Sequence, residues 1–184
     1  VSDPIAGSRR TPAGHELRWQ AAVLGSRNPL PLFFIQHLTP IEERRGLGTS
    51  THPNGVFKIE RAYIVTHDAE GDALKYAEVL GMPSPKVERG TVIMSDMAIF
   101  QLGETGLGLA QPYAHGPAAE ALERRGPGPF QTLFRTTGMD AAASWMHEHG
   151  MPPPARGIRN TGEHAMLVLP ADAFGAYIGF VGPA

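Results

Sequence analysis

The chain has 184 residues, of which 42% are hydrophobic and 18% charged, a composition typical of a folded globular protein and not of a disordered one. Its 16 lysines and arginines are balanced by 18 aspartates and glutamates, so there is no net positive field to attract nucleic acid or an acidic membrane surface. Cysteine is absent, which excludes disulfides, thiolate metal sites and cysteine nucleophiles.

Neither a membrane segment nor a signal peptide is predicted. The longest apolar run, residues 30–35, has the length of a strand, whereas a membrane-spanning helix needs about 20 apolar residues. The first ten residues end in a basic pair that no apolar core follows. We therefore expect a cytoplasmic protein with no membrane partner.

Residues 1–50 are predicted to contain two strands but no complete structural unit. Residues 17–23 alternate between apolar and polar side chains, and residues 30–37 are apolar on both faces until Gln36. These strands look like the end of a β-α-β-β-β unit whose opening strand and helix are missing. Because an uncovered apolar sheet would lie in water, we expect another chain, or a missing N-terminal segment, to complete this unit.

The rest of the sequence contains an internal repeat. Residues 73–85 align without gaps on residues 142–154, with Tyr76 on Trp145 and a shared Gly-Met-Pro-x-Pro ending. Each copy predicts an amphipathic helix that stops at its glycine, because glycine adopts the left-handed conformation past a helix and proline cannot continue one. We expect Tyr76 and Trp145 to be buried in equivalent positions.

Predicted strands surround both helices. The strands of the first copy are residues 57–65, 87–95, 97–102 and 107–112, and those of the second copy are residues 130–135, 155–160, 164–169 and 176–183. This order predicts two β-α-β-β-β units, over residues 51–115 and 116–184, linked by a short helix at residues 117–125. The expected fold is α+β with paired units; the family resemblance that these units and the motifs below carry implies curved mixed sheets that enclose a cavity, with helices on the outer face.

These tandem β-α-β-β-β units resemble those of proteins in the vicinal oxygen chelate superfamily. The sequence is similar to the glyoxalase-like branch of this superfamily. The residues that carry the resemblance are Arg10-x-Pro12-x-Gly14-x-x-Leu17-Arg18-Trp19, residues 30–40, the loop of residues 52–55 and the two repeats. The resemblance implies a protein that acts on a small organic molecule and, if it is an enzyme, uses metal-assisted lyase, isomerase or dioxygenase chemistry. The alternative is a metal-free protein that binds or sequesters such a molecule.

The sequence departs from the metal-binding pattern that the resemblance implies. In the family, ligands come from the first and last strands of each unit. The matching first-strand positions here are Arg61 and Gln131, and the last-strand positions are Phe33, Gly108 and Gly179. Only Gln131 is an acceptable ligand, so no metal ligands are assigned within the chain. The cofactor stays unknown, since a divalent metal is possible only with ligands from outside this chain segment.

Four residues are candidates for contacting a small-molecule ligand, namely Gln36, His37, His52 and Arg18. Gln36 and His37 follow the apolar run at a strand end, where polar groups serve a cavity or satisfy a neighbouring loop. His52 opens a Pro-Asn-Gly sequence that also reads as a plain turn. Arg18 could hold an anion or lie on the solvent face of its strand. No catalytic residue can be identified from the sequence.

Overall fold

The computed structural model describes residues 2–24, 32–45 and 52–184. The chain divides into two compact units, Val1–Ser50 and Thr51–Ala184. Within the described residues, no helix is long and apolar enough to cross a membrane.

The first unit is a three-stranded antiparallel sheet of β1 (Ile5–Arg10), β2 (Glu16–Val23) and β3 (Phe33–His37), followed by the short helix α1 (Ile41–Arg45). The sequence predicted only the second and third of these strands. Strand β1 lacks an alternating apolar pattern and owes its conformation to pairing with β2 along its whole length, from Ile5 opposite Ala21 to Arg10 opposite Glu16. Residues 30 and 31 of the predicted third strand lie outside the described residues.

One face of this sheet is apolar. The register places Trp19 opposite His37, Ala21 opposite Ile35 and Val23 opposite Phe33, so these side chains share a face with Ile5 of β1. The exposed fractions on this face are 67% for Ile5, 50% for Val23, 60% for Phe33 and 46% for Ile35. The apolar surface that the sequence predicts for this sheet is thus largely uncovered.

The second unit consists of two β-α-β-β-β repeats. The first repeat contains β4 (Val56–Val65), α2 (Ala69–Leu80), β5 (Val87–Gly90), β6 (Ser95–Leu102) and β7 (Thr105–Pro112). After α3 (Pro117–Arg125), the second contains β8 (Gly128–Thr136), α4 (Met139–Glu148), β9 (Ala155–Ile158), β10 (His164–Val168), a 3-10 turn η1 (Pro170–Asp172) and β11 (Tyr177–Gly182). The predicted α+β fold of tandem units is confirmed.

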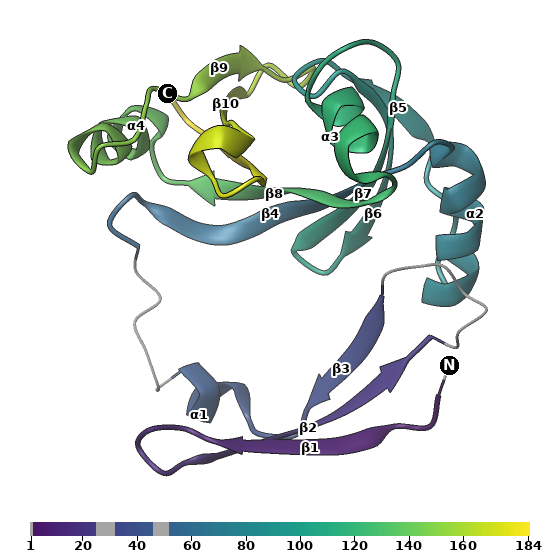
Figure 1. The fold of residues 1–184 in the computed structure, drawn as a ribbon. Coiled ribbons are helices and arrows are strands. Elements are labelled where there is room, and N and C mark those ends of the chain that lie inside the picture. Colours follow the sequence, from purple (N-terminus) through teal and green to yellow (C-terminus); the bar gives the residue numbers. More distant parts are fainter. Residues whose placement is uncertain (1, 25–31, 46–51) are drawn as a thin grey trace. The chain divides into compact units, whose positions relative to one another are not determined.

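All eight strands of this unit belong to one curved mixed sheet in the order β5-β6-β7-β4-β8-β11-β10-β9. This order is symmetric about its centre, where β4 and β8 are antiparallel. The last strand of each repeat pairs in parallel with the first strand of that repeat, β7 with β4 and β11 with β8. Helix α2 packs on β6 and β7, and α4 packs on β10 and β11 (Figure 1).

The two repeat helices differ in their ends and in their burial. Asp68 caps α2 by accepting a hydrogen bond from the Gly71 amide, whereas the N-cap residue of α4 is Gly138, which has no side chain to cap the helix. Tyr76 is buried as predicted and packs near Phe100, with ring centroids 6.3 Å apart. The expectation of equal burial for Trp145 is wrong: Trp145 is half-buried, because its ring stacks on His149, 4.0 Å away between centroids, and His149 is itself exposed.

The predicted strand at residues 87–95 is too long. Strand β5 ends at Gly90 and β6 begins at Ser95, and the four residues between them form a turn. Met94 in this turn has a φ of 53°, which an extended run of residues does not adopt. The apolar residues of this segment therefore reach the interior from a turn.

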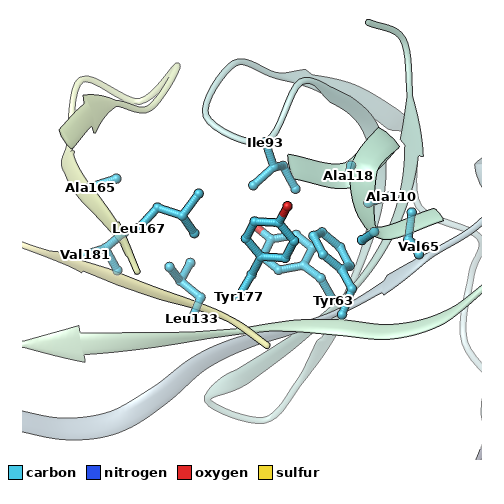
Figure 2. Close-up of a cluster of buried hydrophobic side chains, with 12 residues drawn as sticks. Tyr63, Val65, Ile93, Ala110, Ala118, Leu133, Ala165, Leu167, Tyr177 and Val181 are labelled. Carbon is cyan, nitrogen blue, oxygen red and sulfur yellow. The ribbon is translucent and has the colours of Figure 1, made fainter. Parts of the chain in front are cut away.

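The interior of the curled sheet holds a cluster of buried side chains from both repeats. Figure 2 shows Tyr63, Leu133, Leu167 and Tyr177 converging, with Ile93 approaching them from the β5–β6 turn. A second cluster joins α4 to β10 and β11 through Met139, Met146, Met166 and Phe180. The first cluster borders a cavity between the two repeats.

Candidate functional site

A cavity of about 160 Å³ lies inside the curl of the second unit. The central strands β4 and β8 contribute Arg61, Tyr63, Gln131 and Leu133 to its lining. Its apolar walls include Val92, Ile93, Met97, Ile99, Ala165 and Val181. A cavity of about 150 Å³ accepts a molecule of the size of benzene, so this one has room for a compact organic ligand.

Strand register explains how four side chains meet at the base of this cavity. Tyr63 lies directly opposite Gln131, and Arg61 lies opposite Leu133, across the antiparallel pair β4–β8. Opposite side chains on one face are about 5 Å apart at Cβ, and diagonal neighbours about 7–8 Å, within reach of long side chains. Arg61 and Gln131 are diagonal neighbours in this arrangement.

Glycines on the adjacent strands make room for these side chains. A Cβ added at Gly106 would lie 2.9 Å from Arg61 Nε, and one at Gly108 would lie 2.6 Å from Tyr63 Cδ1. A Cβ at Gly179 would lie 2.7 Å from Gln131 Nε2. Gly108 and Gly179 are the last-strand positions where the family resemblance implies metal-binding side chains. In this protein, Tyr63 and Gln131 occupy the space that such side chains would need.

The base of the cavity, formed by side chains of β4 and β8, is called the cup from here on. A divalent metal does not fit this cup. The positions that would hold it carry a permanently protonated guanidinium at Arg61, a single amide at Gln131, and no side chain at Gly108 and Gly179. Phe33, the third last-strand position, belongs to the other unit and has no ligating atom. No group of three His, Asp or Glu side chains suited to a metal ion occurs in the described part of the chain.

Two residues that line the cavity each have a buried side-chain atom with no hydrogen-bond partner among the described residues, Arg61 Nε and Gln131 Oε1. Arg61 donates one hydrogen bond, from Nη1 to the Tyr63 hydroxyl at 3.0 Å. Among the residues that the structure describes, no carboxylate forms an ion pair with Arg61. An unpartnered buried polar atom destabilises a protein by about 1–3 kcal/mol, so binding is favoured when these side chains turn to meet a ligand in the cavity.

The other cationic side chains around the cavity are neutralised. Arg89 pairs with Asp96 at 2.9 Å and lies over the Tyr113 ring, 4.2 Å from its centroid. Arg159 pairs with Glu163 at 2.6 Å. The remaining charged group of the lining is Glu88, which is exposed at the rim. Arg61 therefore supplies the cavity with a positive charge that no carboxylate contacts within the described chain.

The rim is closed by contacts between the two edge strands of the sheet. The Thr91 hydroxyl donates to Asn160 Oδ1 at 3.0 Å, and the Asn160 amide donates to the Arg89 carbonyl. Thr91 follows β5, and Asn160 follows β9, so these bonds join the first repeat to the second. They hold the curled sheet around the cavity.

The residues predicted from the sequence to bind a ligand lie elsewhere. Gln36 pairs with Gln20, and His37 pairs with Trp19, so the two candidates point to opposite faces of the sheet in the first unit. Arg18 alternates with Trp19 and shares the face of Gln36. All three candidates are exposed.

His52, the fourth candidate, belongs to the second unit. Its carbonyl accepts a hydrogen bond from the Gly55 amide at 2.9 Å, and Gly55 has a φ of 73°. The turn predicted for this sequence is confirmed, and the His52 side chain is exposed.

The sequence analysis matched Arg61 and Gln131 to metal-binding positions of the family and did not predict that they contact an organic molecule. A signal was present in the glycines of the last strands, Gly106, Gly108 and Gly179, which interrupt otherwise apolar segments. A glycine inside a strand often marks the close approach of another group. Which side chain approaches it depends on pairing between strands, and the local sequence does not contain that information.

The comparisons with known proteins agree with this fold. Residues 2–80 match the model of a family described as glyoxalase-like domain. No curated protein matches the sequence. The family match over residues 2–80 agrees with the predicted resemblance to glyoxalase-like proteins, and solved methylmalonyl-CoA epimerases share the fold of this chain.

Several solved structures have the same fold. Methylmalonyl-CoA epimerase from Mycobacterium tuberculosis is 23% identical with a TM-score of 0.65, and the match covers 77% of this chain and 95% of that one. A hypothetical protein from Bacillus halodurans C-125 is 18% identical with a TM-score of 0.59, covering 69% and 94%. A Streptomyces coelicolor methylmalonyl-CoA epimerase variant in complex with 2-nitronate-propionyl-CoA is 22% identical with a TM-score of 0.59, also covering 69% and 94%.

Proposed function

We propose that the second unit binds a small organic molecule in its central cavity without the help of a metal. The observation that carries this proposal is the pair of buried, unpartnered polar atoms on Arg61 and Gln131 inside apolar walls. Binding sites for small molecules typically combine apolar walls with a few polar groups that fix the orientation of the ligand.

Enzymatic chemistry is the second candidate, and the similarity to methylmalonyl-CoA epimerases favours it. By the name of those proteins, the substrate is a thioester of coenzyme A, and only its acyl end would fit a cavity of about 160 Å³. Metal-assisted lyase, isomerase or dioxygenase chemistry would need ligands from outside this cup, because Arg61 repels a cation and Gln131 alone cannot hold one.

A direct test is to measure ligand binding to the full chain in the presence of a chelator. Compact organic molecules would be screened by ligand-detected NMR, first for the unchanged protein and then for Leu133→Trp and Ile99→Trp, which fill the cavity from two different strands. Leu74→Trp, at an exposed position of α2, is the matched control. We expect binding that survives chelation, is lost in both cavity variants and persists in the control. Binding that needs a divalent metal, or that is unchanged in both cavity variants, would contradict the proposal.

For the first unit, we propose that a strand and a helix from another chain, or from an N-terminal segment, complete the sheet at β3. In the second unit, the last strand of each repeat pairs in parallel with a first strand, and the described part of the first unit offers β3 no such partner. Exposed Phe33 and Ile35 support the need for a cover. Light scattering with intact mass, combined with hydrogen exchange, tests this: a monomer of this chain with fast exchange along the outer edge of β3 would overturn it.

We propose that Gln36 and Arg18 contact a ligand on the face of the first unit's sheet that they share, and that His37 contacts one on the opposite face. His52 belongs to the second unit and is proposed as a ligand contact of that unit alone. His37→Ala and Gln36→Ala should each weaken binding and leave the melting temperature nearly unchanged. A loss of stability with binding intact would show that both residues are structural.

A further inference from the structure

We infer that the ligand of the cavity in the second unit is a compact 2-hydroxy carboxylic acid with an apolar side chain. This inference rests on the proposed function, since it assumes that the cavity binds a ligand, and it names the chemical class. Three features of the cavity carry it: the charge of Arg61, the free acceptor of Gln131, and the size and polarity of the walls.

The charge of Arg61 selects a carboxylate. Its guanidinium is planar and permanently protonated, and its geometry matches a carboxylate through two parallel hydrogen bonds. One donor of Arg61 is used by the Tyr63 hydroxyl, while buried Nε has no partner. Glu88 at the rim disfavours a second negative charge at the mouth of the cavity, so a monoanion is preferred.

The free acceptor of Gln131 selects a hydrogen-bond donor on the same ligand. Gln131 is 6% exposed, and its Oε1 atom is buried without a partner. Arg61 and Gln131 are diagonal neighbours across β4 and β8, where Cβ atoms are about 7–8 Å apart before the side chains reach inwards. A carboxylate and a hydroxyl on adjacent carbons place an acceptor and a donor within this short span.

The walls select the rest of the ligand. Ile93, Met97 and Ile99 supply apolar surface beyond the polar base, and the volume of about 160 Å³ matches a small branched or cyclic side chain. A larger polar molecule would leave its own polar groups without partners against these walls.

Calorimetric titration of the full chain with three matched probes tests this inference. The probes are 2-hydroxy-3-methylbutanoate, the same molecule without its hydroxyl (3-methylbutanoate), and the uncharged 2-hydroxy-3-methylbutanamide. We expect the hydroxy acid to bind most tightly. Loss of the hydroxyl should weaken binding by about 10-fold or more, and loss of the charge by about 100-fold.

Variants of the two polar residues should change these ratios selectively. Arg61→Met keeps the aliphatic stem and should weaken binding of the hydroxy acid by about 100-fold while leaving the amide nearly unchanged. Gln131→Leu should make the acids with and without the hydroxyl bind about equally. Arg156→Met removes an exposed arginine paired with Asp140 outside the cavity and should leave all three affinities unchanged.

The outcomes separate this inference from the proposed function. If the amide or the acid without the hydroxyl binds as tightly as the hydroxy acid, the inference is wrong, and the proposed function survives when Leu133→Trp abolishes that binding. If only benzene binds, and Leu133→Trp abolishes that binding, the cavity takes apolar ligands and the inference is again wrong. If neither benzene nor any of the three probes binds, both are contradicted.

Discussion

Gly179 determines how much space Gln131 has inside the cavity. A Cβ at this position would meet Gln131 Nε2 and Leu133 Cδ1, each at 2.7 Å. We predict that Gly179→Ala lowers the free energy of unfolding by about 1–3 kcal/mol, because both side chains must leave their positions. Gly157→Ala is the control, since its added Cβ would meet Val92 at an ordinary 3.6 Å. Equal denaturant midpoints for the two variants would show that Gln131 is free to move aside.

The buried hydroxyl of Tyr76 gives a second prediction about stability, and here the substitution is expected to stabilise the protein. Tyr76 is 2% exposed, and its hydroxyl has no hydrogen-bond partner within the described parts of the chain. Burial raises the pKa of this phenol to about 12. Tyr76→Phe should therefore raise the free energy of unfolding by about 1 kcal/mol, measured by urea titration. A loss of stability would mean that the hydroxyl has a partner, such as an ordered water.

At the scale of single elements, two side chains cap the N-terminus of α2, Asp68 and Gln111, which accepts a hydrogen bond from the Ala69 amide at 3.1 Å. Asp68 accepts a hydrogen bond from the Gly71 amide at 2.9 Å, and Asp68→Ala should lower the free energy of unfolding by about 1 kcal/mol. Glu78→Ala, an exposed acidic residue late in the same helix, serves as control. If both variants have the same thermal midpoint, the cap does not contribute to stability.

Arg135 links the two central strands to the β9–β10 turn. It bonds Glu60 at 2.8 Å and Glu163 at 2.6 Å, and Glu163 also bonds Arg159 at 2.6 Å. The hydrogen bonds from Arg135 lower the pKa of Glu60 from 4.5 to about 2. This group therefore stabilises the fold fully above pH 4.5, and the contribution is lost as the pH falls towards 2.

Acid titration of stability checks this. The free energy of unfolding should decrease between about pH 4.5 and pH 2, and Glu60→Gln should flatten this part of the profile. Glu104→Gln, at an exposed position of the β6–β7 turn, should keep the slope of the unchanged protein. A Glu60→Gln profile as steep as that of the unchanged protein would place the acid sensitivity elsewhere.

Some helices and strands can be predicted from the local sequence, and others cannot. The helices α2 and α3 and most strands of both repeats follow from alternation, from helical periodicity and from glycine and proline stops, which act within a few residues. The predicted strand at residues 87–95 was too long, because a turn separates β5 from β6. Strand β1 was not predicted, because its conformation comes from pairing with β2. The unequal burial of Tyr76 and Trp145 likewise depends on what covers each helix.

At the scale of the whole molecule, the repeat pattern predicted the paired units, while the candidate site came from tertiary packing. The sequence pointed to the strand positions of Arg61 and Gln131 but not to their lack of hydrogen-bond partners. That property arises from glycines on neighbouring strands and from the closing of the sheet by Thr91 and Asn160. In the first unit, Phe33 and Ile35 of β3 are exposed, and the completion of this sheet by a further strand and helix stays a prediction.

The central claim is that the cup of the second unit binds an organic acid in the place where related folds would hold a metal. The measurement that tests it most directly is a crystal structure of the full chain grown with 2-hydroxy-3-methylbutanoate and a zinc salt, with anomalous data collected at the zinc edge. We predict density for the acid in the cavity, its carboxylate on Arg61 and its hydroxyl on Gln131 Oε1, and no anomalous peak in the cup. A zinc ion between β4 and β8, or the acid bound elsewhere with the cavity filled by water, would contradict the account.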